Sequence, residues 1–281
     1  MAKKVTVTTF QEMKETAEKI TMLTAYDYTM AKIVDGSEVE AILVGDSLGM
    51  VMLGYPDTTG VTMEDMLHHT KAVSRGVTRA MVIADMPFLS YHLGIPQSVK
   101  NAGRLIQEGH AQAVKMEGGQ EIIPDIRAIV RAGIPVMGHL GLTPQSIHTI
   151  GGYFIQGKSK EQAEKLIADA LALVEAGVFG IVLECVPAEL AAMITKKVTV
   201  PTIGIGAGAG CDGQVLVIHD LIGMLQGKVA KFVKQYGQIG HFMEEAISRY
   251  VQEVKNGVFP DAEHSYPIEN AALNPANGEQ K

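Results

Sequence analysis

One pattern recurs along the 281-residue sequence: a short apolar, mostly β-branched run ends at a polar residue or glycine, and an amphipathic or alanine-rich segment usually follows. Such runs are typical of parallel strands buried on both faces. The eight candidate strands are Ile20–Asp27, Val39–Asp46, Arg79–Asp85, Ala111–Glu117, Ile134–Leu140, Phe179–Glu184, Pro201–Gly206 and Gln214–His219. Alternation of strands with helices predicts an α/β protein with a parallel sheet.

The segments between the strands carry helix signals. The clearest begins at Ser159, which forms a capping-box pattern with Gln162, and closes at Gly177. The predicted helices between strands are Thr62–Arg75, Pro96–Glu108, Gly119–Arg131, Ser159–Glu175 and Pro187–Lys196. These segments complete the strand–helix units that a parallel sheet requires.

Eight such units favour one closed (β/α)8 TIM barrel over a doubly wound open sheet, because the length fits one barrel and no linker interrupts the chain. We therefore expect residues 1–281 to form a single catalytic domain. Thr9–Lys19, with Thr9 and Glu12 spaced as a capping box, predicts an extra N-terminal helix that covers the barrel bottom. Phe242–Lys255 predicts a helix after the last strand, and residues from about 269 to 281 predict a flexible polar tail.

Charge and cysteine content exclude several classes of function. Lys and Arg number 24 against 31 Asp and Glu, a net charge of −7, and no basic run exceeds a pair, which argues against nucleic-acid binding. Cys185 and Cys211 form no spaced redox or zinc motif, which indicates a reducing compartment. The N-terminus lacks an apolar signal core, and no apolar run is long enough to span a bilayer. We expect a cytoplasmic protein without a membrane partner.

The working residues of a (β/α)8 barrel lie at the carboxyl ends of its strands. Those ends carry Asp46 with Ser47, Asp85, Lys115 with Glu117, His139, and Glu184. Each residue alone has a structural explanation, since a strand-terminal Asp often caps the next helix and a lone His is often a structural residue. Converging at one mouth, however, these groups would repel or desolvate one another unless a cation or an anionic substrate organised them.

The carboxylates Asp46, Asp85 and Glu117 offer oxygen ligands without clustered Cys or His, which favours Mg²⁺ over zinc or iron. By strand alternation Lys115 shares a face with Glu117. The lysine suits three roles: holding a substrate carboxylate or keto oxygen, forming a Schiff base, or pairing with Glu117. His139 suits a contact to a substrate carboxylate or a structural role.

Glu184 follows the apolar run Gly180–Leu183, which would partly desolvate its carboxylate and make it a stronger general base; a salt bridge at the strand end is the alternative. The run Gly204–Gly210 resembles a dinucleotide fingerprint, but a turn and another strand follow it where phosphate binding requires a helix. We interpret it as a loop that exposes backbone to a ligand. His139–Lys158 is a candidate active-face loop.

Several blocks carry a family resemblance: Met22–Asp27, Val44–Gly49, Ala84–Phe88, Val114–Gly119, Met137–Gln145, Glu184–Pro187, Gly204–Gly208 and Lys231–Lys234. In these blocks, over about residues 6–262, the chain resembles the ketopantoate hydroxymethyltransferases. The resemblance implies a TIM barrel assembled as a homodecamer, a pentamer of dimers. It also implies Mg²⁺-dependent transfer of a hydroxymethyl group from 5,10-methylenetetrahydrofolate to 3-methyl-2-oxobutanoate, which gives ketopantoate for pantothenate biosynthesis.

The resemblance carries over to individual residues. Asp46 and Asp85 are similar to direct Mg²⁺ ligands that also contact the substrate, and Glu117 to a third carboxylate of the metal site, acting directly or through water. A keto acid chelated by such an ion has an acidified C3 proton, because the metal stabilises the enolate.

The remaining site residues match substrate contacts and the base. Ser47, Lys115 and His139 are similar to contacts with the α-keto acid, and Glu184 to the proton acceptor.

Two other functions compete. A C–C lyase or mutase of the isocitrate lyase and phosphoenolpyruvate mutase type uses a related barrel and metal-carboxylate face, but isocitrate lyases supply a Cys from a flexible loop. Here Cys185 directly follows the strand end at Glu184. A catalytically silent binding barrel would require the loss of site residues, and none is missing.

Overall fold

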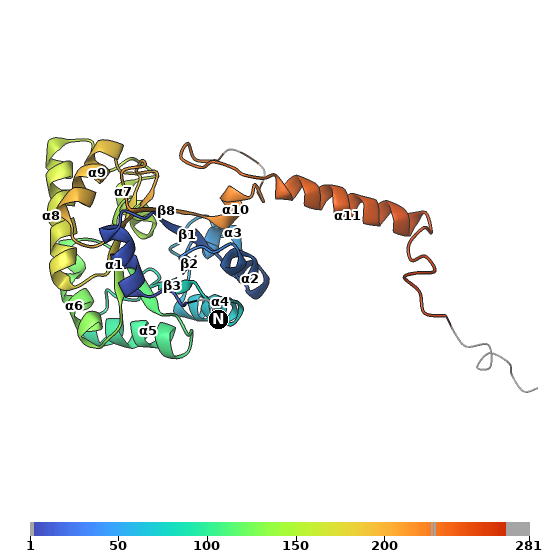
Figure 1. Cartoon of the computed structure of the whole chain (residues 1–281), viewed down its shortest axis with the longest axis horizontal. Helices are drawn as coiled ribbons and strands as arrows, with labels where there is room; N and C mark the ends of the chain where they lie inside the picture. Colours follow the sequence, from blue (N-terminus) through green and yellow to red (C-terminus); the bar gives the residue numbers. More distant parts are fainter. Residues whose placement is uncertain (1–2, 226, 228, 268–281) are drawn as a thin grey trace, which may run out of the picture.

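A computed structural model describes residues 3–225, 227 and 229–267. The eight predicted runs form eight parallel strands that close in sequence order into a barrel, with β8 paired to β1. Figure 1 shows β1 and β8 near each other. The strands are β1 Ile20–Thr24, β2 Ala41–Val44, β3 Met81–Asp85, β4 Ala113–Glu117, β5 Val136–Gly141, β6 Gly180–Glu184, β7 Thr202–Ile205 and β8 Gly213–Leu216. The predicted (β/α)8 barrel is confirmed and the open sheet is excluded.

The α-helices of the described residues are α1 Val7–Glu15, α2 Tyr28–Gly36, α3 Leu48–Val51, α4 Met63–Gly76, α5 Ile95–Gln107, α6 Ile123–Arg131, α7 Ile147–Ile150, α8 Lys160–Ala176, α9 Ala188–Lys197, α10 Ile218–Leu221 and α11 Ile239–Lys255. They include the five that the sequence predicts between strands, now α4, α5, α6, α8 and α9, and also α2, α3, α7 and α10, which it did not predict. The Ser159–Gln162 capping box and the left-handed Gly177 cap of α8 are both present. The predicted helix Gly119–Arg131 instead starts with the 3₁₀ turn Gln120–Ile122.

The extra N-terminal helix is present, but its predicted start is wrong. α1 begins at Val7, and Thr6 is its cap: the Thr6 hydroxyl accepts the Thr9 amide at 3.4 Å, and the Thr9 hydroxyl accepts the Thr6 amide at 3.2 Å. Thr9 is therefore the third helical residue of the capping box rather than the cap. Phe10 on this helix is buried and meets Phe179 edge-on at 5.7 Å.

The barrel interior is apolar towards the amino ends of the strands and polar at their carboxyl ends. Alternate residues of each strand face inward, so Met81 and Ile83 of β3 belong to the inner core and Asp85 follows them at the top. On β5, Met137 lies in that core and His139 follows in the same way. The helix α1 belongs to the same core through Phe10. The candidate site is therefore the uppermost inward layer of the barrel.

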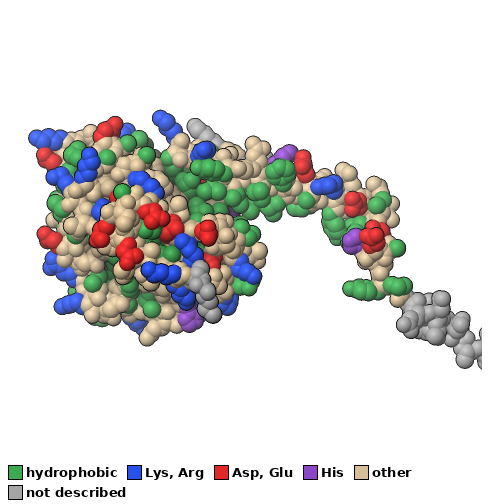
Figure 2. Space-filling model, viewed as in Figure 1, with side chains coloured by type: hydrophobic (Ala, Val, Ile, Leu, Met, Phe, Trp, Pro, Cys, Tyr) green, Lys and Arg blue, Asp and Glu red, His purple; other side chains and the backbone are tan. Residues whose placement is uncertain are grey.

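The last helix, α11, leaves the barrel and extends away from it (Figure 1). Its apolar side chains are largely exposed, including Phe242 at 61%, Ile247 at 59% and Tyr250 at 57%. Figure 2 shows hydrophobic side chains along this extended helix. Helices of the described chain are all too short or too polar to cross a membrane. The predicted flexible tail, residues 269–281, lies outside the described residues.

Candidate active site

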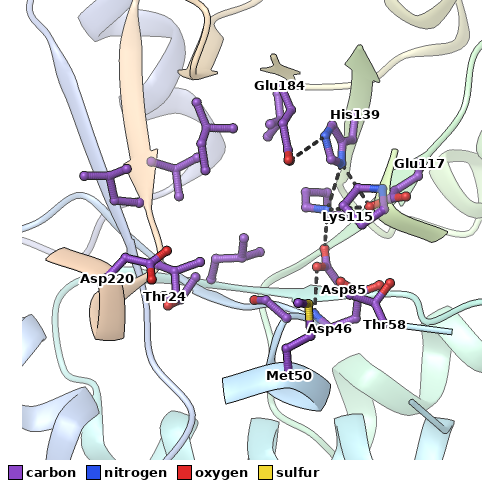
Figure 3. Close-up of a pocket in the computed structure, with 18 of the residues that line it drawn as sticks. Thr24, Asp46, Met50, Thr58, Asp85, Lys115, Glu117, His139, Glu184 and Asp220 are labelled. Carbon is purple, nitrogen blue, oxygen red and sulfur yellow. Dashed lines mark hydrogen bonds and ion pairs between the residues drawn. The ribbon is translucent and has the colours of Figure 1, made fainter. Parts of the chain in front are cut away.

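A cavity of about 160 Å³ opens at the carboxyl end of the barrel (Figure 3). Every sequence-predicted site residue lines it: Asp46, Ser47, Asp85, Lys115, Glu117, His139 and Glu184. Strand register brings them together, because Asp85 pairs with Lys115 across β3 and β4, and Glu117 pairs with His139 across β4 and β5. The prediction that these groups converge at one mouth is confirmed.

Lys115 forms a buried ion pair with Asp85. Its Nζ lies 2.7 Å from Asp85 Oδ1 and 4.0 Å from Glu117 Oε1, so the pairing with Glu117 that the sequence offered is the weaker of the two. Burial, the largest influence, lowers the pKa of Lys115, but its carboxylate neighbours, led by Asp85, raise it above the ordinary value. The side chain therefore stays an ammonium, a form that binds anions and does not act as a Schiff-base nucleophile.

Asp46 and Asp85 are two buried carboxylates at close quarters. Burial, followed by the charges of Asp85 and Glu117, holds the pKa of Asp46 well above its ordinary value. Burial also raises the pKa of Asp85, although Lys115 opposes it. The Asp46 amide donates to Asp85 Oδ2 at 3.0 Å. A bound cation would relieve this mutual repulsion.

The donor set fits Mg²⁺ with few protein ligands. Within the described residues no three acidic, His or Cys side chains already converge into a ligand group. Mg²⁺ usually takes only one or two carboxylates and keeps waters or substrate oxygens in its other positions, which Asp46 and Asp85 satisfy. Glu117 is differently placed: its Oε1 faces His139 Nδ1 at 3.2 Å and its Oε2 accepts the Gln145 amide at 3.0 Å. Because both oxygens of Glu117 already have protein partners, this residue suits a contact to the metal through water.

His139 lies between two carboxylates. Its Nδ1 is 3.2 Å from Glu117 Oε1 and its Nε2 is 3.3 Å from Glu184 Oε2. Burial and the Lys115 ammonium lower the pKa of His139, but Glu117 and Glu184 outweigh them and raise it to about 9. The contact to Glu184 is an ion pair without hydrogen-bond alignment, since Nε2 has no aligned acceptor among the described residues. The imidazolium can therefore turn a donor towards a substrate oxygen.

The backbone around Glu184 is held on both sides. Its carbonyl accepts the Leu142 amide at 2.8 Å, and the next amide, of Cys185, donates to the Ile205 carbonyl at 2.9 Å. Gly141 adopts φ +98°, and a Cβ there would collide with the Glu184 carbonyl. The Glu184 side chain is 16% exposed and reaches into the cavity (Figure 3). A carboxylate on so rigid a support suits a general base.

Comparison with known proteins identifies the family. A model of the ketopantoate hydroxymethyltransferases matches residues 4–262. The chain belongs to this family. It is 59% identical over 268 residues to the 3-methyl-2-oxobutanoate hydroxymethyltransferase of Clostridium novyi, covering 95% of this chain and 98% of that one. It is 60% identical over 270 residues to that of Acetivibrio thermocellus, covering 96% and 95%.

Solved structures of other enzymes share the fold alone. The 2,3-dimethylmalate lyase, a member of the phosphoenolpyruvate mutase and isocitrate lyase superfamily, matches with a TM-score of 0.59 at 16% identity, covering 94% of this chain and 89% of that one. Phosphonopyruvate hydrolase in complex with oxalate and Mg²⁺ matches with 0.56 at 12%, covering 92% and 93%. Identity of 55–60% places the chain with the hydroxymethyltransferases, which are transferases, rather than with these lyases and mutases.

A buried glutamine that sequence reasoning missed connects the carboxylates of this hydroxymethyltransferase. Gln145 Nε2 donates to Asp46 Oδ2 at 2.8 Å and to the Met86 carbonyl at 3.0 Å, while its Oε1 accepts the Tyr91 hydroxyl at 2.7 Å. Its own amide holds Glu117. The residue lies in the loop His139–Lys158, which the sequence predicts at the active face, but no periodicity distinguished it from its neighbours.

We expect Gln145→Leu to lower kcat/KM about 10- to 100-fold, because partners that orient metal-site carboxylates contribute on that order. Leucine keeps the volume and removes both donors to Asp46 and Met86. Steady-state kinetics would measure the effect. Gln11→Leu, on α1 at the opposite end of the barrel, where Gln11 Nε2 donates to exposed Glu15, is the matched control. Equal kinetics for the two variants would contradict the connecting role.

Proposed function

We propose that the chain transfers a hydroxymethyl group from 5,10-methylenetetrahydrofolate to C3 of 3-methyl-2-oxobutanoate, with Mg²⁺, and so produces ketopantoate for pantothenate biosynthesis. One observation carries the proposal: buried Asp46 and Asp85, the Lys115 ammonium and Glu184 line one cavity. Family membership supports the choice of product. An α-keto acid would meet a cation site, an anion-binding ammonium and a base at the same place.

Asp46 and Asp85 would hold the metal, and Glu117 would contact it through water. A bound Mg²⁺ supplies Lewis-acid chemistry that acidifies the C3 proton of a chelated keto acid. Phosphonopyruvate hydrolase, which shares this fold, has been solved with oxalate and Mg²⁺, and oxalate has adjacent oxygens as an α-keto acid does. This supports a hard cation beside the substrate at the barrel mouth.

The remaining side chains would bind and orient the keto acid. The Lys115 ammonium and the His139 imidazolium attract its carboxylate and keto oxygen, and the Ser47 hydroxyl, 2.8 Å from Tyr26 Oη, adds a neutral donor. Fixing the substrate in this way directs its C3–H bond at Glu184. Glu184 takes the proton, and C3 forms a bond to the methylene carbon of the folate as the bond from that carbon to N10 breaks. Water supplies the hydroxyl group as the remaining bond to N5 breaks, and the two folate nitrogens take up the proton removed from C3 and the second proton of the water.

The activity is testable with purified protein. Product analysis should find ketopantoate only when 3-methyl-2-oxobutanoate, 5,10-methylenetetrahydrofolate and Mg²⁺ are all present. The competing C–C lyase activity should be absent, so 2-methylisocitrate incubated without folate should remain uncleaved. Cleavage of that acid without any ketopantoate formation would overturn the proposal in favour of the lyase.

We also propose that the chain assembles as a homodecamer, a pentamer of dimers, in the cytoplasm. The exposed apolar side chains of α11, including Phe242 and Ile247, support burial against another copy, and the free thiols of Cys185 and Cys211 fit a reducing compartment. Light scattering should give ten times the 30.1 kDa chain mass, and Ile247→Asp should reduce it. A wild-type monomer would contradict this assembly.

A further inference from the structure

An acidic side chain outside the predicted site lines the same cavity. Asp220 lies on α10, just after β8, and faces the cavity from the side opposite Asp85 and Lys115 (Figure 3). Among the described residues, no hydrogen-bond donor or basic side chain contacts its carboxylate. Burial raises the pKa of Asp220, although His219 opposes it, which marks a carboxylate with little solvation. A half-buried acceptor that no described residue contacts is ready for donors on a ligand.

The cavity wall beside Asp220 carries the Thr24 hydroxyl, which accepts the Ile218 amide at 3.0 Å, and is otherwise largely apolar (Figure 3). It includes Ile205, Val217 and the ring of Phe232. Phe232 packs closely on Gly206, which adopts φ +65°, and a Cβ at that glycine would lie 2.9 Å from the ring. An aromatic and aliphatic wall that ends at a carboxylate suits a flat ring system with N–H donors at one edge.

The keto acid and the folate, the two substrates of the proposed function, differ in whether they carry N–H donors and a flat ring. The keto acid has no N–H donor, and its own carboxylate would be repelled by Asp220. The pterin ring of the folate is flat and carries two neighbouring donors, the N3–H and the 2-amino group, which match the two oxygens of one carboxylate. The methylene carbon is bonded to N5 on the other ring, so a pterin held at Asp220 by this edge directs its reactive side into the cavity.

We propose that Asp220 is the pterin-binding residue of this enzyme, accepting hydrogen bonds from N3–H and the 2-amino group while the ring lies against Phe232 and Val217. This assignment rests on the proposed function, because it concerns the folate substrate of that reaction. It gives Asp220 a binding role that is separate from the chemistry at Glu184. Loss of the carboxylate should therefore weaken folate binding and leave keto-acid activation intact.

Asp220→Asn keeps the size of the side chain and removes its charge and one acceptor. We expect the Kd for tetrahydrofolate, measured by calorimetry, to rise on the order of 10- to 100-fold. Exchange of the C3 proton of 3-methyl-2-oxobutanoate with solvent deuterium, which needs no folate, should stay within about twofold of wild type. Glu189→Gln, an exposed carboxylate on α9 outside the cavity, is the matched control and should change neither quantity.

A modified ligand makes the test independent of the variant's folding. Wild-type protein should bind 2-desamino-2-methyl-tetrahydrofolate on the order of 10- to 100-fold more weakly than tetrahydrofolate, whereas Asp220→Asn should discriminate less than about threefold. The assignment would be overturned if wild type bound the two folates equally well, or if Asp220→Asn discriminated between them as strongly as wild type does. Ketopantoate formation by wild type would still uphold the proposed function in either case. Wild type that forms no ketopantoate from folate would overturn the proposed function itself.

Discussion

Replacing Glu184 by Gln should lower the turnover number roughly 10²- to 10⁴-fold, the range that positioned general bases contribute. The amide has the shape of the carboxylate but cannot take the C3 proton. Lys115 and Asp85, which form the buried ion pair on the facing strands, are unchanged, so the Kd for 3-methyl-2-oxobutanoate should stay within about threefold of wild type. Steady-state kinetics and calorimetry would measure the two quantities.

Glu189→Gln is again the matched control, because it makes the same chemical change on an exposed helix. Glu184→Gln also removes the carboxylate that lies 3.3 Å from His139 Nε2, so a second variant is needed to separate that effect from the loss of the base. Glu184→Asp retains the charge and shortens the reach, so it should recover part of the rate. Turnover in Glu184→Gln close to that of wild type would remove this residue from the base role.

Replacing Asp85 by Ala should abolish Mg²⁺-dependent binding of the keto acid. Asp85 is a proposed ligand, the nearest partner of Lys115 at 2.7 Å and the acceptor of the Asp46 amide, so its loss disturbs three contacts. The Kd for keto acid in the presence of Mg²⁺ should rise at least about 100-fold, since even residues that only support a metal ligand contribute 10- to 100-fold. Calorimetry with and without Mg²⁺ measures it.

Thermal unfolding separates a binding defect from a folding defect in this variant. Asp85→Asn keeps an acceptor for the Asp46 amide and should fold as wild type does, yet it loses the charge that pairs with Lys115. We expect this variant, too, to lose Mg²⁺-dependent binding. Unchanged binding in a folded Asp85→Ala protein would contradict the placement of the metal.

Strand-end residues were predictable because two simple rules fix their position. Residues of one strand alternate between faces, and parallel strands end at one rim of a barrel. Lys115 and Glu117 therefore had to share the inner face at the same rim as Asp85, and their register confirms it. Such rules act on regular segments and need no knowledge of side-chain contacts.

Residues in loops and short turns were not predictable in this way. Gln145 lies in the loop His139–Lys158, whose path depends on contacts to Tyr91 and Met86 that no local spacing encodes. Asp220 was missed because the predicted last strand extends to His219, whereas β8 ends at Leu216 and a helical turn brings Asp220 to the cavity.

Helix boundaries and helix positions were likewise only partly predictable from the sequence. The predicted capping box near the N-terminus joins Thr9 and Glu12, whereas the chain uses Thr6 with Thr9. The sequence predicts a helix over Phe242–Lys255, within α11, but not its position away from the barrel. A helix that extends away from its own barrel has its position set by contacts that leave no local sequence pattern.

The central claim is that Glu184 removes the C3 proton of a keto acid held beside Asp46 and Asp85. Proton NMR of 3-methyl-2-oxobutanoate in D₂O tests it without folate. We predict that wild type with Mg²⁺ replaces the C3 proton by deuterium, that chelation of the metal stops the exchange, and that Glu184→Gln fails to exchange. Exchange at the wild-type rate in Glu184→Gln, or none in a wild-type protein that forms ketopantoate, would contradict the account.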